Sequence, residues 1–329
     1  MVMAKAAEKK TSKNVTPTKR APSLPAATKA AAKQATPRKS KTAAAKTLPL
    51  VGAHVSAAGS IDRAVANALK IEAEAIQIFG AAPQSWRRKQ HDDESVAAFR
   101  RGAEEAGIGP NFIHGIYLTN LASQDAGNME KGIESLTAEL RLASRLGIAG
   151  VIFHVGSHKG IGFEEMLPQV IDAMKQVLDG APDDVMLCIE NSAGAGNSIG
   201  STWEEIGAII DGVGSEQVKV CLDTCHAFSA GYDLRDAEAL DRLMTEFDQE
   251  IGVERLVAVH ANDSKTELQS GRDRHENIGE GTIGKQGFLN VLAHPAFQQA
   301  PFLLEVPGFE DKGPDAKNVG ILKKLRDRA

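Results

Sequence analysis

The sequence predicts an α/β protein built as a TIM barrel, with eight parallel strands inside an outer ring of helices. Three observations lead to this fold class: short apolar runs recur along the chain, amphipathic segments separate them, and about 280 residues hold eight such units. A barrel of this type typically needs about 250 residues. Continuous apolar runs are typical of strands buried on both faces, as in parallel sheets. A doubly wound open sheet is the alternative, and it usually has fewer strands.

Residues 1–47 precede the predicted barrel and differ from it in composition. They contain twelve Lys or Arg, one acid (Glu8) and no aromatic residue, a net charge of about +11, whereas the remaining residues carry about −16. Such a segment cannot bury enough apolar surface to offset its ordering entropy. We therefore expect a disordered basic tail, followed by a barrel domain at 48–329. Three interpretations of the tail stay open: a cationic arm for a polyanion, an organelle transit sequence, or a solubilising tail without a partner.

Eight apolar runs account for the strands of the predicted barrel. They occupy residues 48–55, 75–79, 111–114, 151–155, 185–190, 218–223, 256–260 and 302–306. The segments between them have helical periodicity and charge, most clearly at residues 93–107, 134–147 and 236–247. Strands and helices therefore alternate along the chain, as parallel strand–helix units require.

Potential metal ligands end the third to the eighth predicted strands. In chain order they are His114, His154, Glu190, Asp223, His260 and Glu305. Side chains alternate between the faces of a strand, so each ligand shares a face with the residue two positions earlier. Those residues, all apolar or small, are Phe112, Ile152, Cys188, Cys221, Ala258 and Leu303. We expect this face to form the barrel interior, with the polar side chains at its carboxyl rim, where the active sites of TIM barrels lie.

Three further candidate ligands lie in loops beyond the strands. His226 follows Asp223 by one short turn, and Asp273 and His275 lie in the long loop after the seventh strand. A single histidine at a strand end is more often a packed residue than a ligand, but six consecutive strands with polar ends need another explanation. Four carboxylates on one rim would repel each other strongly unless cations lay between them. Imidazole and oxygen ligands suit zinc or manganese, and nine of them favour several ions.

Four other histidines fall outside this set. His54 ends the first strand and His158 lies in a glycine-containing loop, and both are expected to support the ligands from behind. His91 and His294 are expected at the surface.

The overall composition is that of a globular protein from a reducing compartment. Hydrophobic residues make up 42% of the chain and charged residues 25%. No apolar run approaches the roughly 20 residues that span a bilayer, so no membrane association is expected. The three cysteines form no C-x-x-C pair, which argues against a disulfide framework and against cysteine-based zinc binding. The expected location is the cytoplasm, or an organelle or the nucleus if the basic tail is a targeting segment.

Seven motifs make the chain resemble the endonuclease IV family of abasic-site endonucleases. They are GAHVSAAGS (52–60), FHVGSH (153–158), IENSAGAG (189–196), CLDTCHAFSAGYD (221–233), HANDSK (260–265), DRHENIGEG (273–281) and LEVPG (304–308). The matching region extends from about residue 50 to about residue 310. The resemblance implies a TIM barrel with three zinc ions, of which manganese could replace one or more.

The resemblance also implies a ligand set and a reaction. The three groups of ligands are His114, His154 and Glu190; Glu190, Asp223, His260 and Glu305; and His226, Asp273 and His275. Glu190 bridges two ions and orients the attacking hydroxide, which makes it the implied catalytic residue. The implied reaction is cleavage of the phosphodiester 5′ to an abasic site in duplex DNA by metal-activated hydroxide. It leaves a 3′-hydroxyl and a 5′-deoxyribose phosphate, and 3′-end trimming could accompany it.

Two loops match family loops that press into the minor groove of DNA. They supply Gln84 and Trp86, and Tyr117 and Leu118, as the expected DNA-binding residues. Gln84 stands where a basic residue is common, and Trp86 could instead anchor its own loop. A base-free sugar has lost stacking and pairing, so flipping it out costs less than flipping a paired nucleotide. The expected partner is duplex DNA with an abasic site, and the expected state is a monomer.

A sugar isomerase or epimerase on the same barrel is the main alternative. Glu190, Asp223, His260 and Glu305 alone would resemble the metal tetrad of such an enzyme, which holds one or two ions. That alternative leaves the other five candidate ligands without a role. A DNA-binding protein without catalysis is a further class, but all nine ligand positions are filled.

Overall fold

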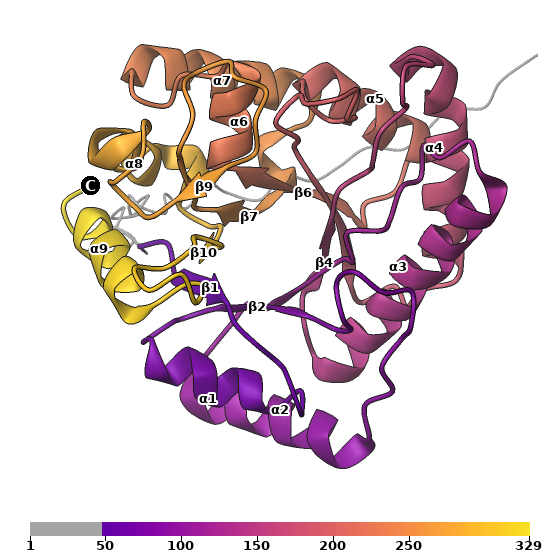
Figure 1. Ribbon diagram of the computed structural model, residues 1–329, viewed down its shortest axis with the longest axis horizontal. Coiled ribbons are helices and arrows are strands. Elements are labelled where there is room, and N and C mark those ends of the chain that lie inside the picture. Colours follow the sequence, from indigo (N-terminus) through magenta and orange to yellow (C-terminus); the bar gives the residue numbers. More distant parts are fainter. Residues whose placement is uncertain (1–47) are drawn as a thin grey trace, which may run out of the picture. The chain divides into compact units, whose positions relative to one another are not determined.

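The predicted TIM barrel is confirmed by the computed structural model, which describes residues 48–329 (Figure 1). The barrel strands are β1 (Val51–His54), β2 (Ile76–Phe79), β3 (Phe112–His114), β4 (Gly150–Phe153), β5 (Met186–Glu190), β6 (Val218–Asp223), β7 (Leu256–His260) and β10 (Phe302–Leu304). Each strand pairs in parallel with the strands before and after it, and β10 closes the barrel against β1. The tail prediction for residues 1–47 lies outside the described residues.

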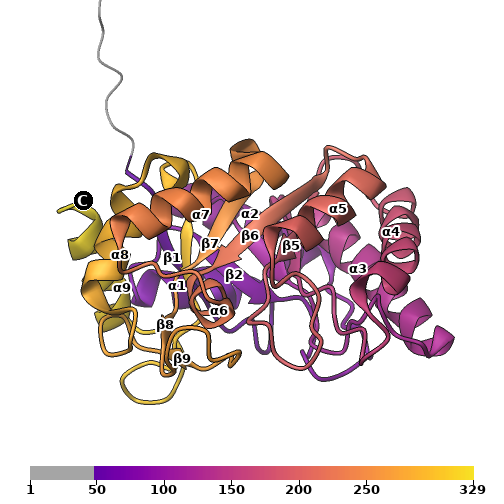
Figure 2. The same cartoon turned by 90° about the horizontal axis from the view of Figure 1, so that it is seen from above.

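Helices surround the barrel and cover its strands (Figure 1). They are α1 (Arg63–Lys70), α2 (Asp93–Ala106), α3 (Ala126–Leu146), α4 (Phe163–Asp179), α5 (Trp203–Val213), α6 (Thr224–Ala230), α7 (Ala237–Glu250), α8 (Gly284–Ala293) and α9 (Ala316–Arg326), with short 3₁₀ turns η1 (Val253–Arg255) and η2 (Pro295–Phe297). A small antiparallel hairpin, β8 (Asp263–Ser264) with β9 (His275–Glu276), lies among the loops on one side of the barrel (Figure 2). Within residues 48–329, the structure has no helix with the length and apolar character that crossing a membrane requires.

The ends of the helices follow local hydrogen bonding. The predicted helix at 93–107 agrees with α2, because the Asp92 carboxylate accepts from the backbone N–H of Ser95 and Gly107 ends the helix with φ of 63°. Helix α3 begins well before the predicted residue 134. The Asp125 carboxylate accepts from the Asn128 N–H at 3.0 Å and so starts the helix before its apolar periodicity becomes visible.

The barrel interior is filled by a small apolar cluster, separate from the larger core between strands and helices. Its buried members are Ala75, Phe112, Ile152, Cys188, Cys221, Ala258 and Leu303. Six of these seven are the residues predicted from strand parity, so the predicted inward face is confirmed. Because side chains two residues apart share a face, the next inward side chains lie at the carboxyl ends of the strands.

Candidate metal centre

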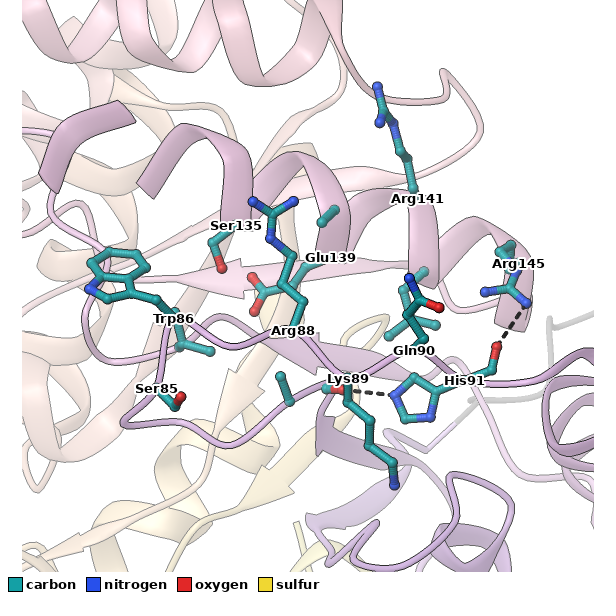
Figure 3. A pocket seen from close by; sticks show the side chains of 15 residues that line it. Ser85, Trp86, Arg88, Lys89, Gln90, His91, Ser135, Glu139, Arg141 and Arg145 are labelled. Carbon is teal, nitrogen blue, oxygen red and sulfur yellow. Dashed lines mark hydrogen bonds between the residues drawn. The ribbon is translucent and has the colours of Figure 1, made fainter. Parts of the chain in front are cut away.

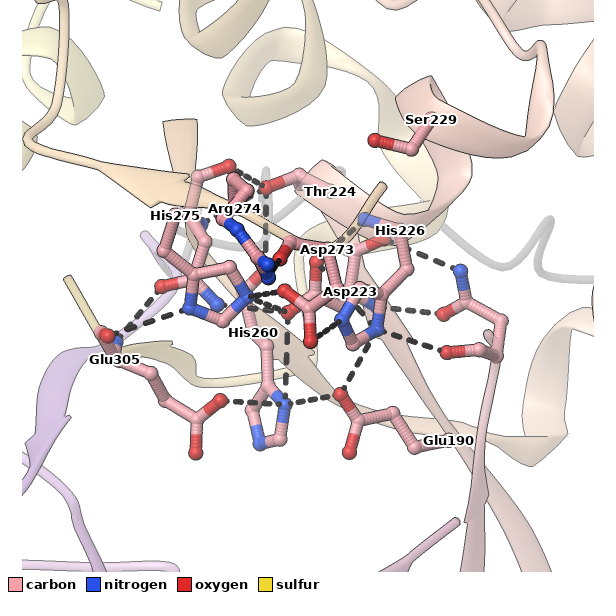
Figure 4. A network of polar contacts seen from close by, with 12 residues as sticks. Glu190, Asp223, Thr224, His226, Ser229, His260, Asp273, Arg274, His275 and Glu305 are labelled. Atoms are coloured by element: carbon pink, nitrogen blue, oxygen red, sulfur yellow. Dashed lines mark hydrogen bonds and ion pairs between the residues drawn. The ribbon is translucent and has the colours of Figure 1, made fainter. Parts of the chain in front are cut away.

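The nine predicted ligands converge at the carboxyl rim of the barrel, and Figure 4 shows all of them except His114 and His154. Strands β4 and β10 end one residue before His154 and Glu305, and the other four strand-borne candidates are the last residues of their strands. Ligand atoms come within 4.8 Å of one another in three groups: His114, His154 and Glu190; Glu190, Asp223, His260 and Glu305; and His226, Asp273 and His275. The first two groups share Glu190. The third adjoins them through His226, which faces Glu190, so the three groups form one continuous cluster.

Glu190 lies at the centre of the cluster and is only 1% exposed. Its Oε2 is 3.3 Å from His114 Nε2 and 3.5 Å from His154 Nε2. Its Oε1 is 3.0 Å from His260 Nδ1 and 3.2 Å from His226 Nδ1. One carboxylate thus faces two sets of imidazoles with its two oxygens, which is the arrangement a bridging ligand needs.

The second group gathers three carboxylates around His260. Its Nδ1 lies 3.5 Å from Glu305 Oε2 and 3.9 Å from Asp223 Oδ2, in addition to its contact with Glu190. The opposite ring nitrogen, Nε2, lies 2.7 Å from Gln77 Oε1. That hydrogen bond orients the ring and leaves Nδ1 directed at the carboxylates.

The third group is built from loops and is more open to solvent. Asp273 is 53% exposed, and its two oxygens lie 3.2 Å from His226 Nε2 and 3.1 Å from His275 Nε2. His275 Nε2 also lies 3.6 Å from Asp223 Oδ2. Neither Nε2 atom has a hydrogen-bond partner of good geometry among the described residues, although both are buried. Buried nitrogens that face carboxylates without bonding them suit a cation between the groups.

Backbone carbonyls orient three of the imidazoles. The Nδ1 atoms of His114, His226 and His275 lie 2.7 Å from Gly115 O, 3.0 Å from Asn191 O and 3.3 Å from Glu305 O. An Nδ1–H that donates to a carbonyl leaves the Nε2 lone pair free to bind a metal. The cluster therefore offers correctly oriented nitrogen and oxygen donors and fits divalent ions such as zinc.

The charges in the cluster shift the pKa values of its members. Burial alone would lower the pKa of His114, but hydrogen bonding to Glu190 and the nearby carboxylates raise it to about 9. Burial would also lower the pKa of His275, but the Asp223 and Asp273 carboxylates raise it to about 9. Burial opposes ionisation of Glu190, yet His154 and His260 hold its pKa well below the ordinary value. Protons on imidazoles thus balance the carboxylates, and a metal ion would displace those protons.

Three supporting residues escaped the sequence analysis. Gln77 is fully buried in β2, donates from Nε2 to Glu305 Oε1 at 2.5 Å and lies 3.1 Å from His54 Nδ1. Asn262 donates to Asp223 Oδ2 at 2.7 Å and accepts from the Glu305 N–H at 2.8 Å. A polar residue within the apolar run 75–79 was the available signal for Gln77.

Asp263 is the third such residue, and it ties the hairpin that carries His275 to the segment that follows it. Its carboxylate accepts from five backbone N–H groups, those of Ser264, Gly279, Gly281, Ile283 and Gly284. The fit is close, because a Cβ at Gly281 would lie 2.5 Å from Asp263 Oδ1. Backbone partners of this kind leave no pattern in the side chains, so nothing local in the sequence marks the role of Asp263.

The remaining histidines take different roles. His54 Nδ1 lies 3.4 Å from Glu305 Oε1, which confirms the expected support from behind a ligand. His158 instead accepts from the backbone of Gly160 and Gly162 and has no polar contact with a candidate ligand among the described residues. The surface placement of His91 is wrong: its side chain is buried, because Nε2 bonds Gly80 O at 2.8 Å. His294 is half-buried, 3.3 Å from Asp241.

Cys225 adds an unexpected member to the cluster. Its thiol sulfur lies within 4.8 Å of donor atoms of Asp223 and His275. Burial, with the Asp223 charge, raises the pKa of the Cys225 thiol to about 11. The thiol therefore stays protonated at neutral pH, and a thiol is a much weaker ligand than a thiolate.

The four predicted DNA-binding residues separate into two places. Tyr117 (58% exposed) and Leu118 (37% exposed) line a cavity of about 490 Å³ together with His154, His226 and Asp273. Gln84 is exposed on the neighbouring loop, which the Tyr117 N–H joins by donating to Pro83 O at 2.9 Å.

Trp86 lies elsewhere and lines a different cavity of about 470 Å³, together with Arg88 and with Ser135 and Glu139 of α3 (Figure 3). None of the nine candidate ligands lines that cavity. Direct contact of Trp86 with DNA stays a prediction.

Known proteins resemble the chain over the whole barrel. A family model for xylose isomerase-like TIM barrels matches residues 65–325. A protein of Methanoculleus marisnigri named probable endonuclease 4 is 45% identical over 278 residues, which are 84% of this chain and 98% of that protein. Endonuclease IV from Thermus thermophilus has a solved structure with a TM-score of 0.76 and 34% identity, over 85% of this chain and 100% of that one.

A D-tagatose 3-epimerase-like protein, at 19% identity and a TM-score of 0.62 over 84% of this chain and 98% of that one, shares the fold. The barrel and its rim of ligands thus place the chain among the xylose isomerase-like TIM-barrel proteins. Within that class, the chain belongs to the endonuclease IV family.

Proposed function

We propose that this chain is a zinc-dependent DNA repair endonuclease that cleaves the phosphodiester 5′ to an abasic site in duplex DNA. The products would be a 3′-hydroxyl and a 5′-deoxyribose phosphate. The observation that carries the proposal is the convergence of nine ligands, in three groups, around the buried Glu190 carboxylate. The names of the relatives, which are endonucleases IV, support the same substrate class.

The residues of the chain would divide the work in a definite way. When bound, zinc ions supply Lewis-acid stabilisation of the attacking and leaving oxygens and a nucleophile at neutral pH. Glu190 would hold its two oxygens toward both buried groups and position the attacking water between them. Its low pKa keeps it ionised for that role throughout the neutral range. Asp273, His226 and His275 would hold an ion at the solvent-exposed end, where a phosphate can enter.

Recognition of the abasic site would depend on the exposed side chains beside the cluster. Tyr117 packs against the rings of Phe79 and His114, with centroids 5.4 and 5.8 Å away, so its own ring is fixed in place although it is exposed. A rigid aromatic side chain next to the cavity could fill the space left by a missing base. Leu118 would extend the same apolar surface.

A sugar isomerase or epimerase would need only part of this site. The tetrad Glu190, Asp223, His260 and Glu305 does form one group. The other five candidate ligands converge on it as well, and an enzyme with one or two ions would not use them. We therefore favour a three-ion nuclease over this alternative.

The test is an assay on a duplex oligonucleotide with one abasic site, preceded by metal analysis of the protein. We expect about three zinc ions per chain, since three ligand groups are present. We also expect a nick on the 5′ side of the abasic site, whose 3′-hydroxyl a DNA polymerase can extend. Strong chelation should abolish the nick and added zinc should restore it.

Undamaged duplex of the same sequence and a set of ketoses serve as controls. Epimerisation of a ketose, with one or two metals per chain, would replace the proposed function by the alternative. A metal-replete protein that leaves the abasic duplex intact would also overturn it.

A further inference from the structure

The cavity of about 490 Å³ adjoins the metal centre and extends well beyond it. Its walls include residues 117–120 after β3, residues 156, 157 and 159 after β4 and residues between 192 and 199 after β5. His154, His226 and Asp273 form its inner end. A phosphate held at the metal centre would therefore have open space beside it for the next part of a DNA strand.

Lys159 brings a positive charge to this cavity. Among residues 48–329, its ammonium group has no ion pair and no hydrogen bond. Its backbone has φ of 46°, in the left-handed region that a lysine rarely adopts. Ser157 Oγ stabilises this conformation by accepting from the Lys159 N–H at 3.3 Å. The exposed ammonium group of Lys159 is thus open to a partner of negative charge, and the backbone that carries it is fixed.

The loop that carries Lys159 is tied to both other walls. Asn120 Oδ1 accepts from the Ser157 N–H at 3.1 Å, and Asn120 Nδ2 donates to Ser157 O at 3.1 Å. On the other side, the His158 N–H donates to Asn197 O at 3.0 Å. The three walls are thus joined by hydrogen bonds at Ser157 and His158, the two residues before Lys159, so the cavity is preformed.

Thr119 supplies a second, independent sign of a ligand. It lines the same cavity and is 7% exposed, yet its hydroxyl has no hydrogen-bond partner among the described residues. Its methyl group faces α3, because a Cβ at Gly132 would meet Thr119 Cγ2 at 3.7 Å. A buried hydroxyl without a partner is costly unless a bound molecule or water satisfies it.

The charges around the cavity favour an anion. Among the described residues that line it, Asp273 is the only carboxylate, and both of its oxygens face histidine nitrogens, those of His226 and His275. We propose that Lys159 and Thr119 form a subsite for a backbone phosphate of the cleaved DNA strand, next to the phosphate at the metal centre. This inference rests on the proposed function. The Lys159 ammonium would pair with the phosphate and the Thr119 hydroxyl would donate to one of its oxygens.

The experiment compares three variants of the full-length, zinc-loaded protein: Lys159→Met, Lys159→Arg and Thr119→Val. Initial nicking rates on the abasic duplex give kcat and KM at salt concentrations from about 50 to 200 mM. We expect Lys159→Met to raise KM about tenfold, because a charge-assisted hydrogen bond is lost, while kcat changes little. The slope of log KM against log salt should fall by about 0.9, the value for one lost phosphate contact. Lys159→Arg should restore the slope.

Thr119→Val should raise KM about threefold without changing the salt slope, since a neutral hydrogen bond is lost. Lys175→Met is the matched control, because Lys175 is exposed on α4 and lines neither cavity. Equal KM values and equal salt slopes for Lys159→Met and Lys175→Met would overturn the subsite. A wild-type protein that leaves the abasic duplex intact would overturn the proposed function instead. In that case, fluorescence anisotropy measures the Kd for undamaged duplex at the same salt concentrations. A smaller salt slope for Lys159→Met than for Lys175→Met would still show that Lys159 contacts a phosphate.

Discussion

The ligands of the candidate metal centre form two sets that are held in place by different means. The strand-borne set stands at the strand ends, and the loop-borne set, His226, Asp273 and His275, lies beyond the strands. His114, Glu190, Asp223 and His260 stand at the ends of barrel strands and are at most 3% exposed. His154 and Glu305, one residue beyond their strands, are 36% and 16% exposed, and Asp273, in the loop between β8 and β9, is 53% exposed. The first set owes its position to the parity of strands whose interior side chains are close-packed. The second depends on a loop that hydrogen bonds must hold in one conformation.

Asp263 ties the hairpin that carries His275 to the segment that follows it. It lies in β8, where it pairs with Glu276 of β9, and Ser264 pairs with His275. Its carboxylate gathers the backbone of residues 279–284 around the hairpin. The strand-borne ligands are held by neighbouring strands, and Gln77 and Asn262 add side-chain support to Glu305, His260 and Asp223. Damage to the loop should therefore affect one group of ligands and spare the others.

Glu190→Gln should have the largest effect, because Glu190 belongs to two of the three groups. We expect kcat on the abasic duplex to fall by about 10³-fold, the scale on which losing one preorganised group at the reacting centre acts. Circular dichroism should show an unchanged fold. Glu216→Gln, at an exposed glutamate, is the matched control and should keep full activity. Full activity of Glu190→Gln would refute its catalytic role.

Asp263→Asn tests whether the loop can fail on its own. An amide nitrogen would face N–H groups that now donate to a carboxylate, so the loop should lose its conformation. We expect zinc affinity at one of three sites to fall by about 10 to 100-fold, the usual effect of removing support behind a ligand. Competition with a chromophoric chelator measures this. Asp315→Asn, at another carboxylate that accepts two backbone N–H groups, is the control. Equal loss at all three sites would contradict the separation of the two sets.

Gln77→Met is the corresponding change behind the strand-borne ligands. Methionine fills a similar volume but leaves Glu305 Oε1 and His260 Nε2 without their bonds to Gln77. We expect about a tenfold loss of zinc affinity, confined to the group that contains Glu305 and His260. The loop-borne group should keep its ion in the same titration. A loss at the loop-borne group would mean that the two sets are coupled through His260.

These two supporting residues also show how far the sequence can predict such a site. The strand-borne ligands were predictable, because strand ends and side-chain parity are local properties. Asp263 was not, because its partners at residues 279–284 are backbone groups brought back by the loop. The cavity that Trp86 lines was equally hidden, since Glu139 from α3 forms another part of its wall. Local periodicity therefore determines the frame of the site, and contacts distant in sequence determine its loops.

The stability of the metal-free protein should depend on pH, and this dependence allows one strand-borne and one loop-borne histidine to be compared. The pKa of His114, on a strand, and that of His275, in the loop hairpin, are both raised to about 9, from 6.5. A raised histidine pKa contributes stability that is fully present below pH 6.5 and is lost as the pH rises through about 9. The lowered pKa values of Glu190 and Asp273 act only at acidic pH and leave this window unaffected.

Thermal unfolding in the presence of chelator should thus show Tm falling between pH 6.5 and 9. Glu139, whose pKa burial raises to about 8, adds to this fall, because its charged form is disfavoured in the folded state. Comparison with single His114→Ala and His275→Ala variants isolates each histidine. Each should reduce the fall by about 2–4 °C, if each contributes about 1 kcal/mol. If both variants reduce the fall in Tm equally, the ion pair of His275 in the exposed loop is as strong as that of His114 in the barrel. A smaller reduction for His275→Ala would show that solvent near Asp273 weakens the ion pair between His275 and Asp273. If the Tm profile is the same in the wild type and both variants, the charge pairing is refuted.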